Sequence, residues 1–413
     1  MNAVMEQEHA PIVTPAFLQD PYPVYAHLRQ EHPVQWSDEF FQGAWLVSRH
    51  ADVEPALRDP RLSAQRTGGW VNEVEGADDA DSRLAQRAFQ RFFARALLFL
   101  DAPDHPRLRK VMMPAFRQDR LLRLQPLLEE WCTELACGLQ GQFDFMERIA
   151  RPLPARVISH LMGVDASLEL DFMQWAEGLA AFIGAARPTA RQLAVAQGCL
   201  TEMLRYFEED LLPRRRLVPR DDLVGTLLAA EADGTIQSHG ELLAQCAMLL
   251  FAGYETTRNL LGNGMHAFMT HRDQWQALCA NPSLAPQAVR ELLRYDSPVQ
   301  WTGRRAATSF EWHGQQIRRG DLIILLIGSA NRDPARHEAP DRLDVQRIQP
   351  GALSFGSGPH VCIGAGLTQL EAQAMFSALA RQCPDLLPDG PPLRDGNPVY
   401  RGVRQLPMQR AVA

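Results

Sequence analysis

The segment FGSGPHVCIG, from Phe355 to Gly364, constrains the fold of this 413-residue chain more than any other stretch. Its glycines and Pro359 favour a tight, rigid loop, and Cys362 falls where a following helix would begin. Unpaired N–H groups and the positive end of a helix dipole favour a thiolate there. Apolar residues then recur at roughly helical spacing, at Leu367, Leu370, Met375 and Leu379. We predict a metal-binding thiolate, because the alternative of a buried structural cysteine does not account for this ordered loop.

This loop resembles the haem-binding signature of the cytochrome P450 family, Phe-x-x-Gly-x-(Arg or His)-x-Cys-x-Gly, and matches every specified position. The resemblance implies that Cys362 is the axial ligand of haem b iron, as a thiolate that favours O–O cleavage. It also implies that His360 bonds a haem propionate, and that Phe355 and Gly364 border the haem. The implied fold is mainly α with small β-sheets (α+β), with the haem buried between a long distal helix and the cysteine loop.

Composition agrees with a large soluble enzyme, since 46% of the residues are hydrophobic and 22% are charged. A net charge of −7 offers no general attraction to nucleic acid. Seven cysteines, an odd number without framework spacing, are expected to be reduced. The N-terminus shows neither a signal peptide nor a membrane anchor. We expect one catalytic domain over residues 1–413, cytoplasmic and monomeric.

Strand-like segments occur near both ends of the chain, and about 250 residues of mainly helical periodicity separate them. The early strands are predicted at 34–36 and 44–47, and the late strands at 310–312, 316–317 and 322–327. This arrangement agrees with the fold that the family resemblance implies.

The segment Ala252-Gly-Tyr-Glu-Thr-Thr257 lies inside a long helical pattern that starts near His239. Glycine and paired threonines are costly within a helix and favour a bulge or kink that leaves room for a small ligand. The alternative is a glycine that allows close helix packing. The segment resembles the family's distal-helix motif, which implies that Ala252 and Gly253 lie beside the haem. By the same resemblance, Glu255 and Thr256 form the acid–alcohol pair that delivers protons when O2 is activated.

Glu291 and Arg294 stand three residues apart on a predicted helix, a spacing that by itself indicates only an ordinary ion pair. The family joins such a Glu-x-x-Arg pair to a later arginine behind the haem loop, which implies Arg342 as the third member. We expect a buried structural triad, because guanidinium forks match carboxylate geometry.

The segment from Asp101 to Arg109 reads as a helix start with acidic residues and proline. It resembles a family segment in which a histidine and an arginine contact the haem propionates, which implies this role for His105 and Arg109. Arg304 is the expected third contact, with Arg305 as the alternative. Buried propionates need such paired donors.

No Gly-x-Gly-x-x-Gly fingerprint of a nucleotide-binding reductase is present in the sequence. The resemblance therefore implies that NAD(P)H electrons arrive through a separate ferredoxin and ferredoxin reductase. We expect an acidic ferredoxin to dock on the cysteine side, at Arg107, Arg109, Lys110 and Arg117.

The expected substrate is a hydrophobic small molecule, free or bound to a carrier. Candidate pocket residues, by family position, are Trp70, Leu97, Leu98, Phe182, Leu249, Ala252, Val299, Trp301 and Tyr400. Tyr254 either bonds the substrate or packs. The expected reaction is monooxygenation with O2, by hydroxylation or epoxidation. Oxidative coupling or desaturation and a non-catalytic haem-thiolate sensor or carrier stay open as alternatives.

Overall fold

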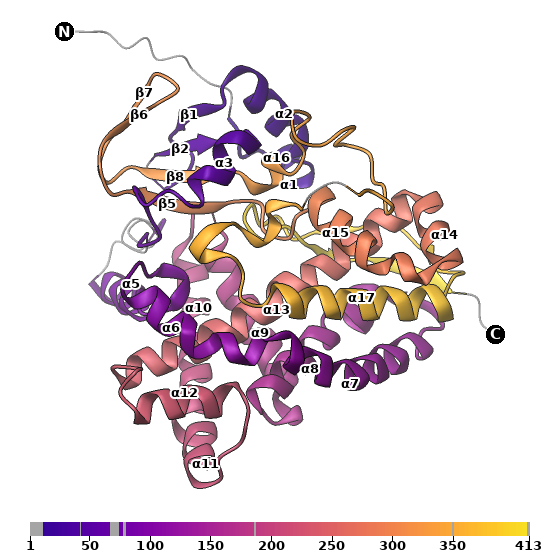
Figure 1. Ribbon diagram of the computed structural model, residues 1–413, viewed down its shortest axis with the longest axis horizontal. Helices are drawn as coiled ribbons and strands as arrows, with labels where there is room; N and C mark the ends of the chain where they lie inside the picture. The colour runs from indigo at the N-terminus through magenta and orange to yellow at the C-terminus, as the bar shows by residue number, and fades with distance from the viewer. Residues whose placement is uncertain are drawn as a thin grey trace.

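The structure is a computed structural model that describes residues 11–41, 43–66, 74–76, 80–185, 187–348 and 351–410. Figure 1 shows a large helical body with a smaller β-rich region, built mainly from the N-terminal strands and β5–β8, packed along one side. The mainly α fold with small β-sheets is therefore confirmed. Within the described residues, no helix is long and apolar enough to cross a membrane.

The helices in the first half of the chain are α1 (Pro15–Gln19), α2 (Tyr22–Glu31), α3 (His50–Ala56), α5 (Ala80–Phe93), α6 (Asp104–Met112), α7 (Gln118–Cys137), α8 (Pro152–Met162), α9 (Glu169–Ile183) and α10 (Ala190–Tyr206). Those that follow are α11 (Leu212–Leu217), α12 (Leu223–Ala232), α13 (His239–Thr270), α14 (Arg272–Ala280), α15 (Ala285–Tyr295), α16 (Ile327–Ala330) and α17 (Ala365–Gln382).

The strands are β1 (Val34–Ser37), β2 (Ala44–Val47), β3 (Leu62–Ser63), β4 (Gly141–Asp144), β5 (Thr302–Ala306), β6 (Phe310–Trp312), β7 (Gln315–Ile317), β8 (Leu322–Leu325), β9 (Leu387–Pro388), β10 (Leu393–Arg394), β11 (Val403–Gln405) and β12 (Pro407–Arg410). The largest sheet has the order β1-β2-β8-β5-β3, in which β2 and β8 are parallel and the other pairs antiparallel. The predicted strands are present, except that the last one ends at Leu325 and Ile327 begins α16.

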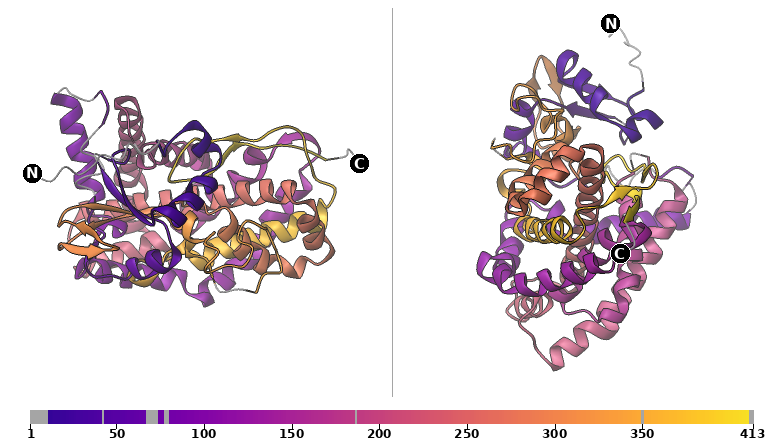
Figure 2. Two further views of the ribbon diagram at one scale, coloured as in Figure 1. Left: turned by 90° about the horizontal axis from the view of Figure 1, so that it is seen from above. Right: turned by 90° about the vertical axis from the view of Figure 1, so that its right-hand side faces the viewer.

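Helix α13 runs through the centre of the molecule and contributes to both large hydrophobic cores. One core joins its first half to α5, α6, α9 and α10, and the other joins its second half to α7, α15 and α17. Figure 2 shows this central position from two further sides. A helix buried all round needs apolar residues on every face, which explains its weak amphipathic pattern.

The predicted bulge at residues 252–257 does not interrupt α13, which is continuous from His239 to Thr270. A Cβ atom on Gly253 would lie 2.8 Å from Cδ1 of Ile158 in α8. Gly253 therefore allows close helix packing, which is the alternative that the sequence left open. The hydroxyl of Thr256 donates to the carbonyl of Ala252 at 3.1 Å, as expected of a threonine inside a helix.

Candidate functional site

The loop before α17 holds Cys362 at one wall of a cavity. Gly356 and Gly358 adopt φ angles of 72° and 74°, a left-handed region that favours glycine. The N–H of Cys362 donates to the carbonyl of Phe355 at 2.8 Å and closes the loop. Cys362 is exposed and lines this cavity. The loop therefore presents the sulfur toward the interior of the fold.

Helix α13 lines the same cavity with one face, whose cavity-lining members are Gln245, Met248, Leu249, Ala252 and Thr256. Their spacing of three and four residues is that of one helical stripe. Most of the stripe is apolar, and Thr256 supplies a hydroxyl at its far end. The cavity is thus lined by both a thiol and a hydroxyl.

Four basic side chains line the same cavity, namely His105, Arg109, Arg304 and His360. The rings of His105 and His360 lie 3.9 Å apart between centroids. Burial lowers the pKa of Arg304 to about 10. Burial and the neighbouring Arg304 lower the pKa of Arg66 to about 9.

Among the described residues, no carboxylate lies within 4.0 Å of the guanidinium groups of Arg109, Arg304 or Arg66. The nearby carboxylate of Asp101 is engaged by the hydroxyl of Ser63 and the N–H of Ala64. Buried positive charge without a partner is costly. This donor set fits two carboxylates of a bound group, such as the propionates of haem.

Arg304, rather than Arg305, is the arginine at the cavity. Its Nη1 donates to the carbonyl of Gly303 at 2.8 Å and to the hydroxyl of Thr302 at 3.3 Å. Arg305 points away and donates to the carbonyl of Gly320 at 2.6 Å. The alternation of side chains along strand β5 accounts for this separation of neighbouring residues.

Glu255 does not line the cavity, although the family resemblance pairs it with Thr256. Its side chain is 3% exposed, and its Oε1 accepts from Arg258 at 2.9 Å and from Asn259 at 3.1 Å. Its Oε2 is buried without a hydrogen-bond partner. Burial raises the pKa of Glu255 to about 7, although Arg258 opposes this rise. The carboxyl can therefore hold or release a proton near neutral pH.

Arg258 connects three carboxylates from separate parts of the chain. Besides Glu255, it pairs with Glu177 of α9 at 3.3 Å and with Asp395 of the β10–β11 segment at 2.7 Å. Tyr254 donates its hydroxyl to the same Glu177 at 2.8 Å, so it packs between helices and does not face the cavity. Sequence reasoning missed Arg258, which lies on the same helix face as Glu255 one turn later.

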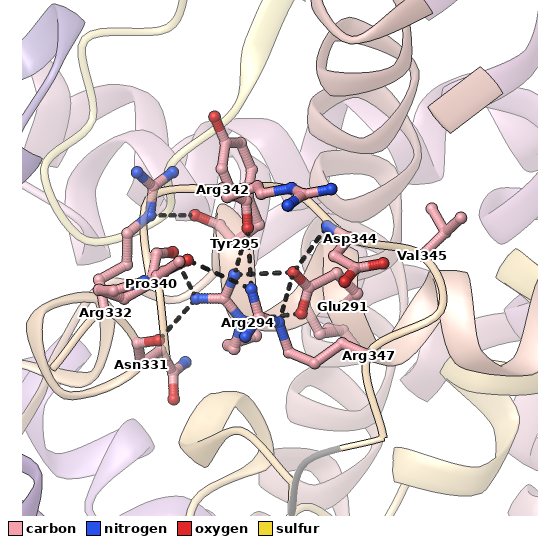
Figure 3. Close-up of polar contacts among 12 residues, drawn as sticks. Glu291, Arg294, Tyr295, Asn331, Arg332, Pro340, Arg342, Asp344, Val345 and Arg347 are labelled. Atoms are coloured by element: carbon pink, nitrogen blue, oxygen red, sulfur yellow. Dashed lines mark hydrogen bonds and ion pairs between the residues drawn. The ribbon is translucent and has the colours of Figure 1, made fainter. Parts of the chain in front are cut away.

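The buried network around Glu291 and Arg294 has Arg347, not Arg342, as its third member (Figure 3). Arg294 pairs with Glu291 at 2.7 Å, and Nε of Arg347 lies 3.0 Å from the same carboxylate. The prediction of Arg342 is therefore wrong. Its backbone carbonyl accepts from both arginines, while its side chain is exposed.

The network reaches the cysteine loop through Asn331. Arg294 donates to the carbonyl of Asn331 at 3.1 Å. The side chain of Asn331 accepts from the N–H of Leu353 at 2.7 Å and donates to Ser354 at 2.9 Å. These bonds fix the start of the loop that ends at Cys362.

Of the nine predicted pocket residues, five line the cavity, three pack elsewhere and one lies outside the described residues. Those that line it are Leu97, Leu98, Leu249, Ala252 and Val299. Phe182 packs on Phe89, Trp301 packs between Phe40 and Phe41, and Tyr400 packs on Phe251. Trp70 lies outside the described residues. Met248, Leu293 and Ile363 line the cavity and were not predicted, because apolar residues at helical spacing also occur throughout ordinary cores.

Comparison with known proteins shows the family of this chain. The family model for cytochrome P450 matches residues 178–394. Cytochrome P450 107B1 of Saccharopolyspora erythraea is 38% identical, over 95% of this chain and 96% of that protein. Vitamin D(3) 25-hydroxylase of Pseudonocardia autotrophica is 37% identical, over 90% of this chain and 88% of that protein.

Solved structures agree with these relatives. The crystal structure of P450BioI in complex with an acyl carrier protein ligated to hexadec-9Z-enoic acid has a TM-score of 0.85 and 30% identity. The match covers 95% of this chain and 99% of that chain. The protein described here is an oxidoreductase that uses thiolate-ligated haem b, O2 and electrons derived from NAD(P)H. It is a bacterial-type monooxygenase and belongs to the cytochrome P450 family.

Proposed function

We propose that Cys362 would ligate the haem iron through its sulfur and that the apolar space beside Thr256 holds a hydrophobic substrate. The observation that carries this proposal is the single cavity lined by the Cys362 thiol, the Thr256 hydroxyl and four basic side chains. When bound, the haem supplies the activation of O2. The chain supplies the shape of the site, its charge and its protons, within one catalytic domain.

The basic cluster would bind the haem propionates through His105, Arg109, Arg304 and His360. Phe355 lines the cavity beside Cys362, and a Cβ on Gly364 would lie 4.0 Å from the sulfur. Burial raises the pKa of the Cys362 thiol, while the N–H of Gly364 and Arg109 oppose this rise. Ionisation of the thiol is therefore expected to accompany binding of a metal cation.

Thr256 and Glu255 would move protons at the distal side. The Thr256 hydroxyl, bonded to Ala252, can accept and donate at the cavity surface. The unpartnered Oε2 of Glu255 can hold a proton near neutral pH. Because Glu255 lies outside the cavity lining, it reaches Thr256 by rotation of its side chain or through water.

The substrate we propose is an apolar small molecule that becomes hydroxylated or epoxidised. The apolar stripe Met248, Leu249 and Ala252, facing Leu97 and Leu98, supports an apolar ligand. The likeness to a vitamin D(3) hydroxylase supports hydroxylation of such a molecule. Delivery on a carrier protein is a second possibility, which the likeness to P450BioI supports. We place the enzyme in the cytoplasm.

Electrons would arrive from a ferredoxin and its reductase on the side of the cysteine loop. Of the four expected docking residues, Lys110 and Arg117 are exposed. Arg107 instead pairs with Glu241 at 2.7 Å, and Arg109 faces the cavity. Arg58 is exposed and donates to Ser357 of the loop at 2.8 Å, so it joins the proposed docking face.

Salt and charge reversal test this docking face. Ferredoxin-supported reduction should slow as salt rises, because salt screens exposed charges. The double variant Lys110→Glu/Arg117→Glu should slow ferredoxin-supported reduction further. The control Arg205→Glu on α10 should leave the rate of this reduction unchanged. If the reduction rate changes neither with salt nor in the double variant, an apolar docking face is favoured.

The reduced carbon monoxide complex tests the ligand assignment. Wild type should show the red-shifted Soret band that thiolate ligation produces, and Cys362→Ser should lose it. Cys137→Ser, which removes another exposed thiol, should keep the band. Thr256→Ala should also keep the band. With a compound that shifts the ferric spectrum, however, this variant should consume NAD(P)H without oxidising a matching amount of the compound. Full coupling in Thr256→Ala would refute its role in proton delivery.

A further inference from the structure

Gln245 lies on the cavity face of α13, one turn before Leu249, and its side-chain amide is fully engaged. Its Oε1 accepts from the N–H of Leu97 at 3.0 Å. Its Nε2 donates to the carbonyl of Arg95 at 2.7 Å and to that of Glu241 at 3.1 Å. The side chain is 1% exposed. These bonds tie the segment after α5 to the central helix.

The segment held by Gln245 is part of the cavity wall. Leu97 and Leu98 form a short 3-10 helix between α5 and α6, and both line the cavity. A separate contact fixes α6, because Arg107 pairs with Glu241 at 2.7 Å one turn earlier on α13. Gln245 therefore acts on the leucine wall, whereas Glu241 acts on the helix that carries His105 and Arg109.

We propose that Gln245 determines substrate size by fixing the position of the Leu97–Leu98 wall. This inference rests on the proposed function of the cavity. Arg66 donates to the carbonyl of Leu98 at 3.4 Å. Among the described residues, however, the hydrogen bonds of Gln245 are those that join this segment to α13, so they set how far the leucine wall stands from that helix. Moving the wall would leave Oε1 of Gln245, the N–H of Leu97 and the carbonyl of Arg95 without these hydrogen bonds, which is costly. These hydrogen bonds of Gln245 go to backbone atoms, so they do not depend directly on which side chains occupy positions 97 and 98.

Azole titration of the ferric holoenzyme tests the proposal. Dissociation constants for imidazole and for the bulky azole clotrimazole are measured from the Soret shift in wild type and Gln245→Leu, which keeps the side-chain size. The ratio of the two constants should change by about tenfold in favour of the bulky azole, the effect expected for losing one buried hydrogen bond. Amide hydrogens of residues 95–100 should also exchange faster, by about tenfold.

Gln274→Leu is the matched control. The Oε1 of Gln274 accepts from the N–H of Val345 at 3.0 Å, and Gln274 does not line the cavity. This variant should leave the azole ratio and the exchange of residues 95–100 unchanged. If Gln245→Leu does not load haem, Gln245→Glu replaces it, because an ionised carboxylate cannot donate to Arg95.

Equal changes in both azole constants, or unchanged exchange at residues 95–100, would overturn the proposal and leave Gln245 a purely structural residue. Failure of the proposed function is recognised separately. In that case wild type itself would lack the thiolate-type carbon monoxide band, whatever the azole ratio.

Discussion

Glu255 has a pKa of about 7, so its carboxyl is protonated below neutral pH and ionised above it. Proton delivery that depends on this group should therefore weaken as pH rises through 7. We expect coupled turnover of wild type to fall on the alkaline side and turnover of Glu255→Gln to be flat there. Loss of a general acid should also lower the variant's rate by about a hundredfold. Steady-state rates from pH 6 to 9, about one to two units either side of that pKa, measure both effects.

Arg258 provides the matching test, because its positive charge lowers the pKa of Glu255. Arg258→Met should shift the alkaline decline to higher pH, since burial and Asp395 raise the pKa of Glu255 and only the hydrogen bond from Asn259 then opposes them. A decline that stays in place in this variant would mean that another group controls the profile.

Helix geometry alone predicts the direction of the Glu255 side chain. The family motif, which pairs Glu255 with Thr256, instead suggests that both side chains face the cavity. Successive residues of an α-helix point about 100° apart, since there are 3.6 residues per turn. Placing Thr256 at the cavity therefore turns Glu255 away from it. What the sequence could not supply was the partner set, because Glu177 and Asp395 are brought to Arg258 only by tertiary packing.

At the scale of elements, the correction from Arg342 to Arg347 leads to a direct comparison of the two residues. Arg347→Ala should leave the carboxylate of Glu291 with one partner fewer and should strongly reduce haem loading, because breaking a buried pair costs about 3–5 kcal/mol. Arg342→Ala should load haem normally, since only its backbone takes part. Haem content per protein, from absorbance, measures the difference. Normal loading of Arg347→Ala would show that the ion pair with Arg294 suffices.

Helix α17 contains a buried carboxyl that the proposed chemistry does not use. Glu371 is 1% exposed, its Oε2 has no partner, and burial raises its pKa well above the ordinary 4.5. A raised pKa contributes stability that is present below 4.5 and is lost as pH rises toward the folded-state pKa. Wild type should therefore lose about 1.4 kcal/mol per pH unit relative to Glu371→Gln across this range.

Melting temperatures near pH 5 and pH 8, values set about half a unit and about three and a half units above that ordinary pKa, measure this difference. At the higher pH, the melting temperature of Glu371→Gln should rise relative to that of wild type. Glu129→Gln, an exposed residue of α7, should show no such dependence. An identical difference at both pH values for Glu371→Gln would mean that the carboxyl ionises normally in the folded protein.

Elements with strong periodicity or a motif were predictable, and irregular segments were not. The strands predicted at 34–36 and 44–47 followed from their apolar residues and turn signals, and the first extends one residue further in the structure. The segment from 331 to 348 has no periodicity, so the choice between Arg342 and Arg347 depended on how the backbone turns there. For the same reason, Leu97 and Leu98 were assigned to the pocket by family position, and their tie to Gln245 was not foreseen.

At the scale of the whole molecule, Asp296 joins the two ends of the described chain. Its carboxylate accepts from the Tyr22 hydroxyl at 2.8 Å and from Nε of Arg401 at 2.6 Å. Arg401 also donates to the carbonyls of Leu18 and Gln19 near the N-terminus. These residues are far apart in sequence, and no local pattern indicates that they meet.

The chemistry of Asp296 leads to a stability prediction. Burial alone would raise its pKa, but Arg401 and Arg394 hold the pKa well below its ordinary value. A lowered pKa contributes stability above the ordinary value of 3.8, and this contribution is lost only as pH falls through the folded-state pKa. It is therefore fully present at neutral pH. Asp296→Asn should lower the free energy of unfolding by about 3–5 kcal/mol there, because two buried arginines lose their partner.

Asp341→Asn is the control, since it also removes a carboxylate paired with an arginine. Asp341 pairs with Arg332 at 3.1 Å, but its side chain is 72% exposed. An exposed pair contributes about 1 kcal/mol or less, so this variant should unfold at nearly the wild-type urea concentration. Urea titrations of both variants at pH 7, about three units above the ordinary pKa of an aspartate, compare them directly. If Asp296→Asn lowers the free energy of unfolding no more than Asp341→Asn does, the chain ends are held by apolar packing around Tyr22 and Tyr25, and the buried charges add no net stability.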